Sequence, residues 1–369
     1  MPFLNEMVQS FQATSAETER TSDRPETEGG PSPRDQTESI KGRFAFRPDD
    51  VASLLKSRIR GQPEAVTSVL EGLRVVKAGL HKPTKPLFVG LLVGPTGVGK
   101  TEMARVVAEA IWGDRNRLCR VDMNTLSQEH YAAALTGPPP GYVGSKEGNT
   151  ILEKDKIEGT FSKPGVVLFD EVEKASQVVL RALLNVFDHG TMALASGKER
   201  FDFTNSIIFM TSNIGARKII KFHRGSKFST KVRWRLFSRR DKDSPILSVI
   251  KKDIESQLDP EFINRIDKII AFNWLGRRAI EEIVRLELDD LRARARAAGA
   301  QLRVQEEVIA LLCDKGFDDV YGARSVYRAV RWHVEVPLAN AMLETPPCEN
   351  VRTYDLSRVG DSIRVQVAG

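Results

Sequence analysis

The residues with the clearest capacity for chemistry lie in segment 94–101, which reads Gly-Pro-Thr-Gly-Val-Gly-Lys-Thr. The segment fits the phosphate-binding pattern G-x-x-x-x-G-K-[ST] at every fixed position, and it lies between an apolar run at 87–93 and a helical pattern at 101–111. Backbone N–H groups of such a loop turn toward a phosphate, Lys100 adds a cation, and the Thr101 hydroxyl can reach Mg²⁺. We therefore predict a nucleoside triphosphate site whose binding residues are Gly94, Pro95, Thr96, Gly97, Val98, Gly99, Lys100 and Thr101.

Two acidic residues, Asp170 and Glu171, end another apolar run at 166–171. After a strand, two acids are more often a helix cap than a catalytic pair when nothing else accompanies them. Together with the Lys100 loop they favour hydrolysis, because Asp170 could hold Mg²⁺ beside Thr101 and Glu171 could polarise the attacking water as a general base.

Three further residues could act on the terminal phosphate. Asn213 closes the apolar run 206–212 with an amide able to bind the water or the phosphate, although in isolation it would be read as a turn residue. Arg265 and Arg324 could stabilise charge that grows in the transition state, although a surface role is the default for an arginine in so basic a chain. We assign catalytic roles to Glu171, Asn213, Arg265 and Arg324.

The elements that must position these residues are buried strands alternating with helices. Apolar runs at 87–93, 118–123, 166–171 and 206–213 predict four strands of a parallel sheet covered on both faces, and helical spacing precedes them at 49–80. Beyond residue 272 the pattern is mainly helical, over 277–298, 305–313 and 323–343, and 351–367 alternates enough for one or two strands. The predicted organisation is an α/β nucleotide-binding domain over 43–272 and a small, mainly helical domain over 273–369.

Composition narrows the class of protein. The chain has 369 residues, 41% hydrophobic residues and a net charge of +6, which suits a globular protein. No apolar run approaches the roughly 18 residues of a membrane span, and no secretion signal opens the chain, so we expect a soluble intracellular protein without membrane contact. A cytoplasmic location is favoured over a mitochondrial one.

The three scattered cysteines indicate a reducing compartment and no metal site. The polar segment 1–42 is expected to be a disordered tail.

A basic insert interrupts the first domain over 216–252. It holds 13 lysines and arginines against two aspartates, with Trp234 and Phe237 among them. Such a mixture is compatible with contact to RNA or DNA, but a solvated basic face or a subunit-contact loop is favoured.

The order of six motifs resembles the second ATPase module of Clp-type AAA+ unfoldases, and the ClpB disaggregase group in particular. The matching stretches are 94–101, 137–144, 167–175, 210–213, 262–267 and 321–324. The resemblance implies that ATP is the nucleotide and that Ile59 lines the adenine pocket. It also implies that Asn213 is a first sensor, Arg324 a second sensor, and Arg265 a finger inserted into a neighbour's site.

The same resemblance implies a role for the segment Gly141-Tyr142-Val143-Gly144. In the family, an aromatic residue on such a loop projects into the channel of a hexameric ring and grips the substrate chain. Glycines on both sides permit the loop to move, and an aromatic face binds polypeptide with little sequence preference. Without the family, this stretch would be an ordinary turn.

The function expected from these observations is an ATP-driven unfoldase or disaggregase that threads unfolded or aggregated polypeptide through a homo-hexamer. The first alternative is the regulatory ATPase of a compartmental peptidase. It is disfavoured because the docking tripeptide of such relatives is missing from the region of the basic insert, where only Ile-Gly-Ala at 214–216, directly after Asn213, is found. The second alternative is a nucleic-acid remodelling AAA+ ATPase that uses the insert.

Overall fold

A computed structural model describes residues 42–128, 151–193, 200–224, 245–318, 322–345 and 351–368. The expected tail, except for Gly42, lies outside these ranges. So do the expected channel residues Tyr142 and Val143, and the central part of the basic insert with Trp234 and Phe237.

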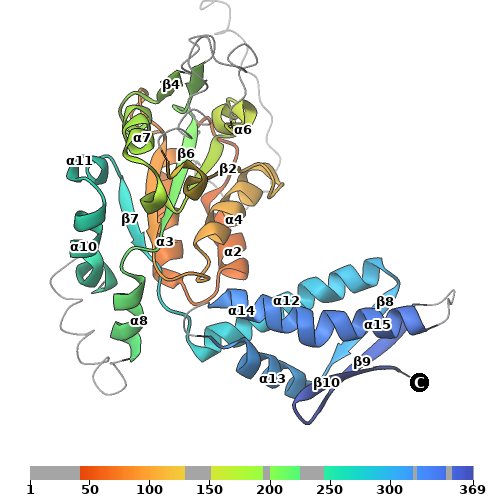
Figure 1. Cartoon of the computed structure of the whole chain (residues 1–369). Coiled ribbons are helices and arrows are strands. Elements are labelled where there is room, and N and C mark those ends of the chain that lie inside the picture. Colours follow the sequence, from red (N-terminus) through yellow and green to blue (C-terminus); the bar gives the residue numbers. More distant parts are fainter. Residues whose placement is uncertain are drawn as a thin grey trace, which may run out of the picture. The chain divides into compact units, whose positions relative to one another are not determined.

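A five-stranded parallel sheet forms the centre of the first domain (Figure 1). Its strands lie in the order β2-β3-β6-β1-β7. They are β1 (Phe88–Val93), β2 (Cys119–Asp122), β3 (Gly165–Asp170), β6 (Ser206–Ser212) and β7 (Lys268–Ala271). Every residue of β1, β3 and β6 is buried, as expected for continuous apolar runs covered on both faces. The α/β fold class with a parallel sheet is therefore confirmed.

The edge strand β7 was not predicted from the sequence. It has only four residues, begins with the charged Lys268, and follows directly on Asp267, so it carries little strand pattern of its own. Its pairing with β1, which places Leu91 opposite Ile269, stabilises this segment as a strand, whereas its local sequence does not predict one.

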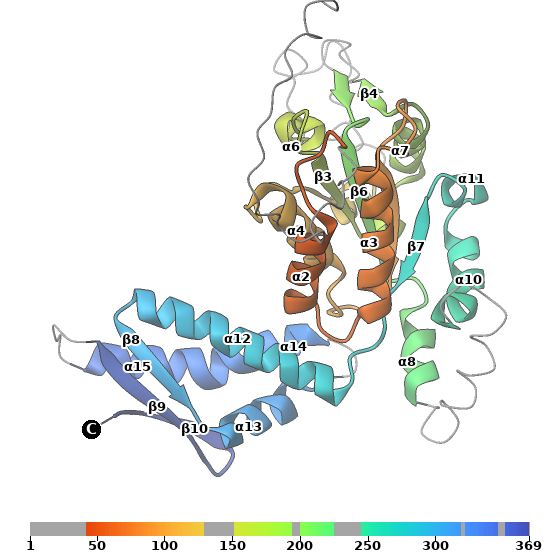
Figure 2. The same ribbon diagram turned by 180° about the vertical axis from the view of Figure 1, so that it is seen from behind.

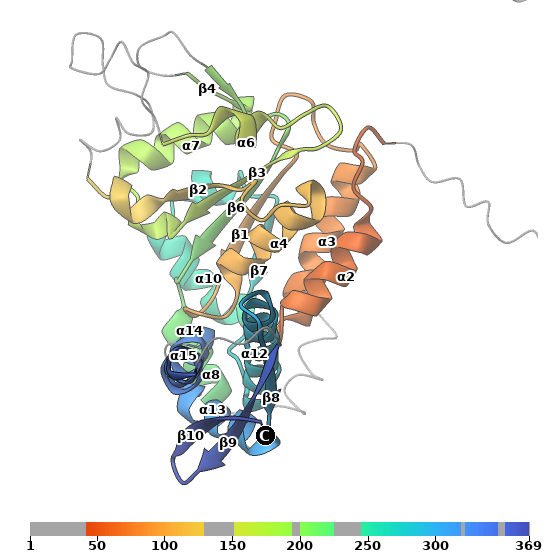
Figure 3. The same ribbon diagram turned by 90° about the vertical axis from the view of Figure 1, so that its right-hand side faces the viewer.

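Alternation along the strands divides the core into two layers. Helices α2 (Pro48–Arg58), α3 (Pro63–Lys77) and α4 (Lys100–Trp112) cover one face of the sheet (Figure 3). Leu92, Leu168 and Phe209 of the strands pack with them in one core cluster. Leu91, Phe169 and Met210 pack with α7 (Gln177–His189) and α10 (Pro245–Gln257) on the other face. This division follows from the period of two along a strand, which points successive side chains to opposite faces.

Shorter elements complete the first domain. They are the helices η1 (Met123–Leu126), α6 (Lys154–Glu158), η3 (Val172–Lys174), α8 (Ala216–Arg224) and α11 (Pro260–Ile263), and the antiparallel pair β4 (Thr191–Ala193) and β5 (Arg200–Asp202). The ends of the predicted basic insert thus fall on two helices, α8 and α10.

The C-terminal domain combines helices with a small sheet (Figure 2). Its helices are α12 (Arg277–Ala297), α13 (Glu306–Gly316), α14 (Ala323–Val330), the π-helical turn η4 (Arg331–Glu335) and α15 (Val336–Glu344). Strands β8 (Ala300–Val304), β9 (Arg352–Val359) and β10 (Ser362–Val367) form a sheet in the order β10-β9-β8. Strand β8 was not expected. In the part of the chain that the structure describes, no helix is long and apolar enough to cross a membrane.

The layered core predicts a large cost for removing a central aromatic ring. Phe209 is fully buried, so Phe209→Ala should lower the free energy of unfolding by about 3–5 kcal/mol through lost apolar contact and a cavity. Phe161 is 76% exposed, and Phe161→Ala is the matched control, with an expected change within about 0.5 kcal/mol. Chemical denaturation of the two variants measures the difference, and equal losses would contradict this account of the core.

Candidate functional site

The phosphate-binding loop joins the end of β1 to the start of α4. Gly97 and Gly99 adopt φ angles of 74° and 103°, which a side chain would strain, so the two glycines allow the chain to turn tightly before the helix. The first turn of α4 leaves backbone N–H groups without helical partners at the loop, an arrangement that favours an anion.

Lys100 is the most deeply placed charge at this loop, with 7% of its surface exposed. Its Nζ donates to the carbonyl oxygens of Gly94 at 2.7 Å and Pro95 at 2.8 Å, and to Oδ1 of Asn213 at 2.9 Å. Burial lowers the pKa of this amine to about 8, and the neighbouring charge of Glu173 opposes that shift. The hydrogen bonds fix the ammonium group beside the loop, where it can bind a phosphate, although burial disfavours its charged form.

Asp170 ends β3 beside the start of α4. Its Oδ1 accepts from the hydroxyl of Thr101 at 3.3 Å and also from the hydroxyl of Thr211. Its Oδ2 accepts from Arg120, through Nε at 3.0 Å and Nη2 at 2.6 Å. The predicted metal-holding pair, Asp170 and Thr101, is therefore brought together.

The oxygen donors at this point fit Mg²⁺ that arrives with a nucleotide. In the described ranges, no group of three or more His, Cys, Asp or Glu residues could hold a metal ion without other ligands. Mg²⁺ commonly takes one or two protein oxygens and completes its shell with phosphates and water. The hydroxyl of Thr101 and the carboxylate of Asp170 are donors of this kind.

Glu171 has an unusual backbone. Its φ of 60° and ψ of 53° place it in the left-handed region, and no other non-glycine residue among those described has a positive φ. Its N–H donates to Oγ1 of Thr211 at 2.9 Å. Such conformations cost about 1–3 kcal/mol and cluster at functional sites.

Asn213 connects the acidic residues to the phosphate loop. Its Nδ2 lies 3.4 Å from Oε1 of Glu171, and its Oδ1 accepts from Lys100 and from the Thr96 hydroxyl at 3.3 Å. Its backbone N–H donates to Oε1 of Glu173 at 3.0 Å. Hydrogen bonds to both the side chain and the backbone therefore fix Asn213 directly after the end of β6.

Arg324 reaches the same site from the C-terminal domain. The N–H of Ala323 donates to the carbonyl oxygen of Gly97 at 2.9 Å, so the start of α14 contacts the phosphate loop directly. The charge of Arg324 acts on Lys100 and contributes to lowering its pKa. The predicted residues Arg324 and Lys100 are therefore close enough for their charges to interact at the phosphate loop.

Ile59 belongs to the same apolar core layer as Val98 of the phosphate loop. It is buried at the end of α2, and the chain then reaches Gln62, which has 1% of its surface exposed. The side chain of Gln62 exchanges two hydrogen bonds of 2.8 Å with the backbone of Asn273 and approaches the Val98 carbonyl oxygen at 3.4 Å. The role of Ile59 at adenine stays a prediction.

Arg265 is not brought to this site. It precedes β7, where the N–H of Asp267 donates to the Val89 carbonyl at 2.9 Å near the start of β1, whereas the phosphate loop follows the end of β1. The two ends of this six-residue strand are about 16 Å apart.

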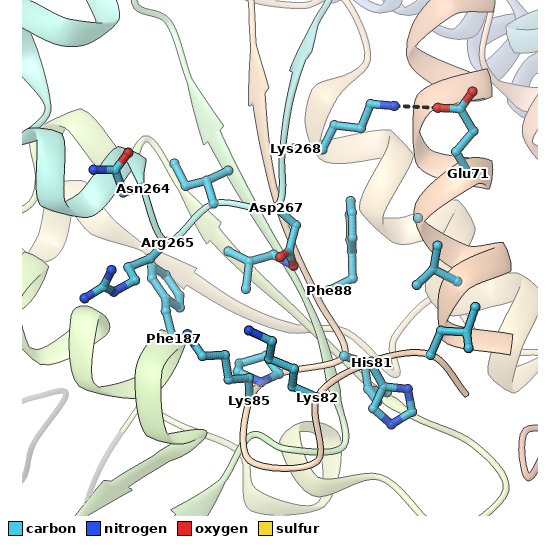
Figure 4. A pocket seen from close by; sticks show the side chains of 17 residues that line it. Glu71, His81, Lys82, Lys85, Phe88, Phe187, Asn264, Arg265, Asp267 and Lys268 are labelled. Atoms are coloured by element: carbon cyan, nitrogen blue, oxygen red, sulfur yellow. Dashed lines mark hydrogen bonds and ion pairs between the residues drawn. The ribbon is translucent and has the colours of Figure 1, made fainter. Parts of the chain in front are cut away.

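Arg265 lies at the edge of a separate hollow, which it helps to line (Figure 4). The hollow has a volume of about 540 Å³ and includes Phe187 and Lys85 in its lining. Nε of Arg265 donates to Asp188 at 2.7 Å, and Lys85 donates to the same carboxylate at 3.1 Å. These two cations lower the pKa of Asp188, chiefly through the hydrogen bond from Arg265.

Four residues of the site were missed by reading the sequence: Arg120, Glu173, Thr211 and Gln62. Thr211 and Asn213 are two positions apart at the end of one predicted strand, so they lie on the same face, and this spacing could have identified Thr211. Glu173 follows the two predicted acids closely. Nothing in the local sequence marks Arg120, whose place depends on the pairing of β2 with β3.

Nucleotide affinity should depend on pH through Lys100. Its charge is present below the pKa of about 8 and is lost as the pH rises through that value, while a bound phosphate favours the charged form. The affinity for a fluorescent ADP analogue should stay level between about pH 7 and pH 8 and then fall by up to about tenfold per pH unit. Lys100→Met should bind weakly at every pH without this fall. Fluorescence titration tests both, and a wild-type affinity that is level to about pH 10 would contradict the assignment.

Comparison with known proteins identifies the family. The family model described as "AAA domain (Cdc48 subfamily)" matches residues 85–269, and the model for the "C-terminal, D2-small domain, of ClpB protein" matches residues 275–352. These matches cover the phosphate loop, the acidic strand end and the domain that carries Arg324.

Individual relatives agree with this result. The "ATP-dependent protease ATP-binding subunit-like protein AmiB" of Pseudomonas aeruginosa is 44% identical over 332 residues, which are 88% of each chain. An "ATP-dependent protease ATP-binding subunit-like protein" of Rhodococcus erythropolis is 41% identical over 88% of this chain and 92% of its own.

A larger relative matches only in part. The "Chaperone protein ClpB" of Prochlorococcus marinus is 33% identical over 85% of this chain, but the match covers 34% of ClpB. Family and fold agree with what the sequence predicted, and the chain is a Clp-type AAA+ ATPase of the second-module type, which hydrolyses ATP.

Proposed function

We propose that the chain works as a protein unfoldase or disaggregase, in which ATP hydrolysis within a homo-hexamer moves polypeptide through a central channel. The observation that carries the proposal is the separation of Arg265 from the other predicted catalytic residues. A protomer that lacks this guanidinium at its own site needs a neighbour to complete it, and a head-to-tail contact of that kind closes into a ring.

Within one site, each residue would contribute a distinct step. Magnesium, when bound with ATP, would neutralise charge on the phosphates and help to orient them. Thr101 and Asp170 would hold that ion, and Lys100 would bind the terminal phosphates. Glu171 would accept a proton from the attacking water, and Asn213, whose amide contacts Lys100 and lies near Glu171, would hold the water and the phosphate in line.

The arginines would act late in the reaction. Arg324 would stabilise the growing phosphate charge from the C-terminal domain, and Arg265 would do so from the next protomer. Asp188 binds Arg265 through Nε, and no bond to its two terminal nitrogens is found among the described residues. Those nitrogens would be presented to the neighbouring phosphate.

A mixing experiment tests action across the interface. Arg265→Ala and Glu171→Gln should each reduce ATPase activity by about 10³-fold or more. Mixed in equal amounts, the two variants should regain activity well above either alone, because some sites would combine an intact Glu171 with a neighbour's intact Arg265. A chain that carries both substitutions is the control, since mixing it with the Glu171→Gln variant forms no such site. Mixtures that stay as inactive as the separate variants would count against the shared site.

Substrate threading is tested at Tyr142. Tyr142→Ala should leave the basal ATPase rate within about twofold but stop the unfolding of a tagged folded protein, because the aromatic grip is lost. Tyr142→Phe keeps the ring and should retain unfolding. Fluorescence loss of the folded substrate and phosphate release are measured in parallel, and unfolding by the Tyr142→Ala variant would overturn the threading role.

The names of two relatives support a second candidate, the ATPase of a compartmental peptidase. The Pseudomonas and Rhodococcus proteins, which match this chain over most of their length, are both named as protease subunit-like proteins. The missing docking tripeptide is the counter-argument. ATP-dependent degradation of a tagged substrate by a co-purified peptidase ring would favour this function over disaggregation.

Stimulation of the ATPase by RNA or DNA, but not by unfolded protein, would favour nucleic-acid remodelling.

A further inference from the structure

Thr211 contacts both of the acidic residues that were predicted from the sequence, Asp170 and Glu171. It lies near the end of β6 with 1% of its surface exposed. Its hydroxyl donates to Oδ1 of Asp170 and accepts the backbone N–H of Glu171 at 2.9 Å. A hydroxyl has one proton to donate and lone pairs to accept with, so this one group serves both neighbours at the same time.

The other contacts at the site reach only one of the two acids. Arg120 and Thr101 bind Asp170, and the Asn213 amide approaches Glu171. Among the described hydrogen bonds, the Thr211 hydroxyl alone joins Asp170 to Glu171. The peptide bond between the two residues does not fix how the Asp170 carboxylate lies relative to the Glu171 turn, and loss of the Thr211 hydroxyl would remove the hydrogen-bonded link between that carboxylate and the Glu171 N–H.

The link bears on the conformation of Glu171. The backbone of Glu171 lies in the left-handed region, with a φ of 60°. A non-glycine residue keeps such a conformation only where the surrounding structure holds it. Among the described hydrogen bonds, the Glu171 N–H donates to the side-chain hydroxyl of Thr211, and the Glu171 carbonyl accepts from the N–H of Lys174 at 2.9 Å. The first is the one that also depends on the position of Asp170.

We propose that Thr211 is a positioning residue for ATP hydrolysis, which fixes the water-activating Glu171 relative to the metal-holding Asp170. The inference rests on the proposed roles of those two carboxylates. A metal on Asp170 and a water beside Glu171 must be aligned with one phosphate, and a displacement of about 1 Å can cost about a hundredfold in rate. Thr211 sets that alignment without touching the nucleotide.

The test compares Thr211→Val with Thr211→Ser. Valine keeps the branched shape and removes the hydroxyl, whereas serine keeps the hydroxyl. Thr211→Val should lower kcat roughly 10- to 100-fold with KM within about threefold, and Thr211→Ser should stay within about threefold of wild type in both. If the valine variant does not fold, Thr211→Ala replaces it with the same expectation.

A second readout does not depend on turnover. The Mg²⁺ concentration at which a fluorescent ADP analogue is half bound should rise several-fold in Thr211→Val and should be unchanged in Thr211→Ser. A valine or alanine variant with wild-type kcat and wild-type Mg²⁺ dependence would overturn the inference. So would a serine variant as impaired as the valine one, because a lost shape rather than a lost hydroxyl would then be the cause.

Glu171→Gln separates this inference from the roles on which it rests. If Glu171→Gln hydrolyses ATP at the wild-type rate, the proposed role of Glu171 fails and the inference fails with it. If Glu171→Gln is inactive while Thr211→Val turns over normally, the role of Glu171 stands and the Thr211 inference alone is overturned.

Discussion

The site depends on one constraint, which is that parallel strands end at a common edge. Strand β6 lies between β1 and β3 in the sheet, with Val93 opposite Ser212 and Phe169 opposite Met210. Residues that follow these strands are therefore neighbours, although they are far apart in sequence. The phosphate loop, Asp170 and Asn213 meet for this reason, and the two apolar layers of the core keep the strands in that register.

Much of this arrangement could be predicted because each part has a local signature. Buried strands read as apolar runs, and the phosphate loop has fixed glycines and a lysine. The missed residues depend on pairing between distant segments. Arg120 belongs to a strand whose exposed positions are unremarkable, and only its place beside β3 directs the guanidinium to Asp170. Strand β7 was missed for a similar reason, since its four residues gain order from β1.

Charge at the site is balanced over short distances. One buried ammonium, Lys100, lies among the carboxylates of Asp170, Glu171 and Glu173, and N–H or O–H groups donate to both oxygens of Asp170 and to one oxygen of each glutamate, whereas Oε2 of Glu173 is buried without a donor among the described residues. An isolated buried charge would be costly, and here each charge has a counter-charge or a donor. The phosphates of a nucleotide would bring further negative charge to Lys100, so binding would change the charge balance of the site.

The contact between Gly322 and the phosphate loop has a mechanical meaning. A Cβ at Gly322 would lie 2.9 Å from the Gly97 carbonyl oxygen, closer than real Cβ atoms approach, and the φ of 52° also excludes most side chains. Next to it, the Ala323 N–H holds that same oxygen. Rotation of the peptide plane that carries the Gly97 carbonyl therefore cannot occur without breaking this bond or displacing the start of α14, so the phosphate loop and the start of α14 are mechanically coupled.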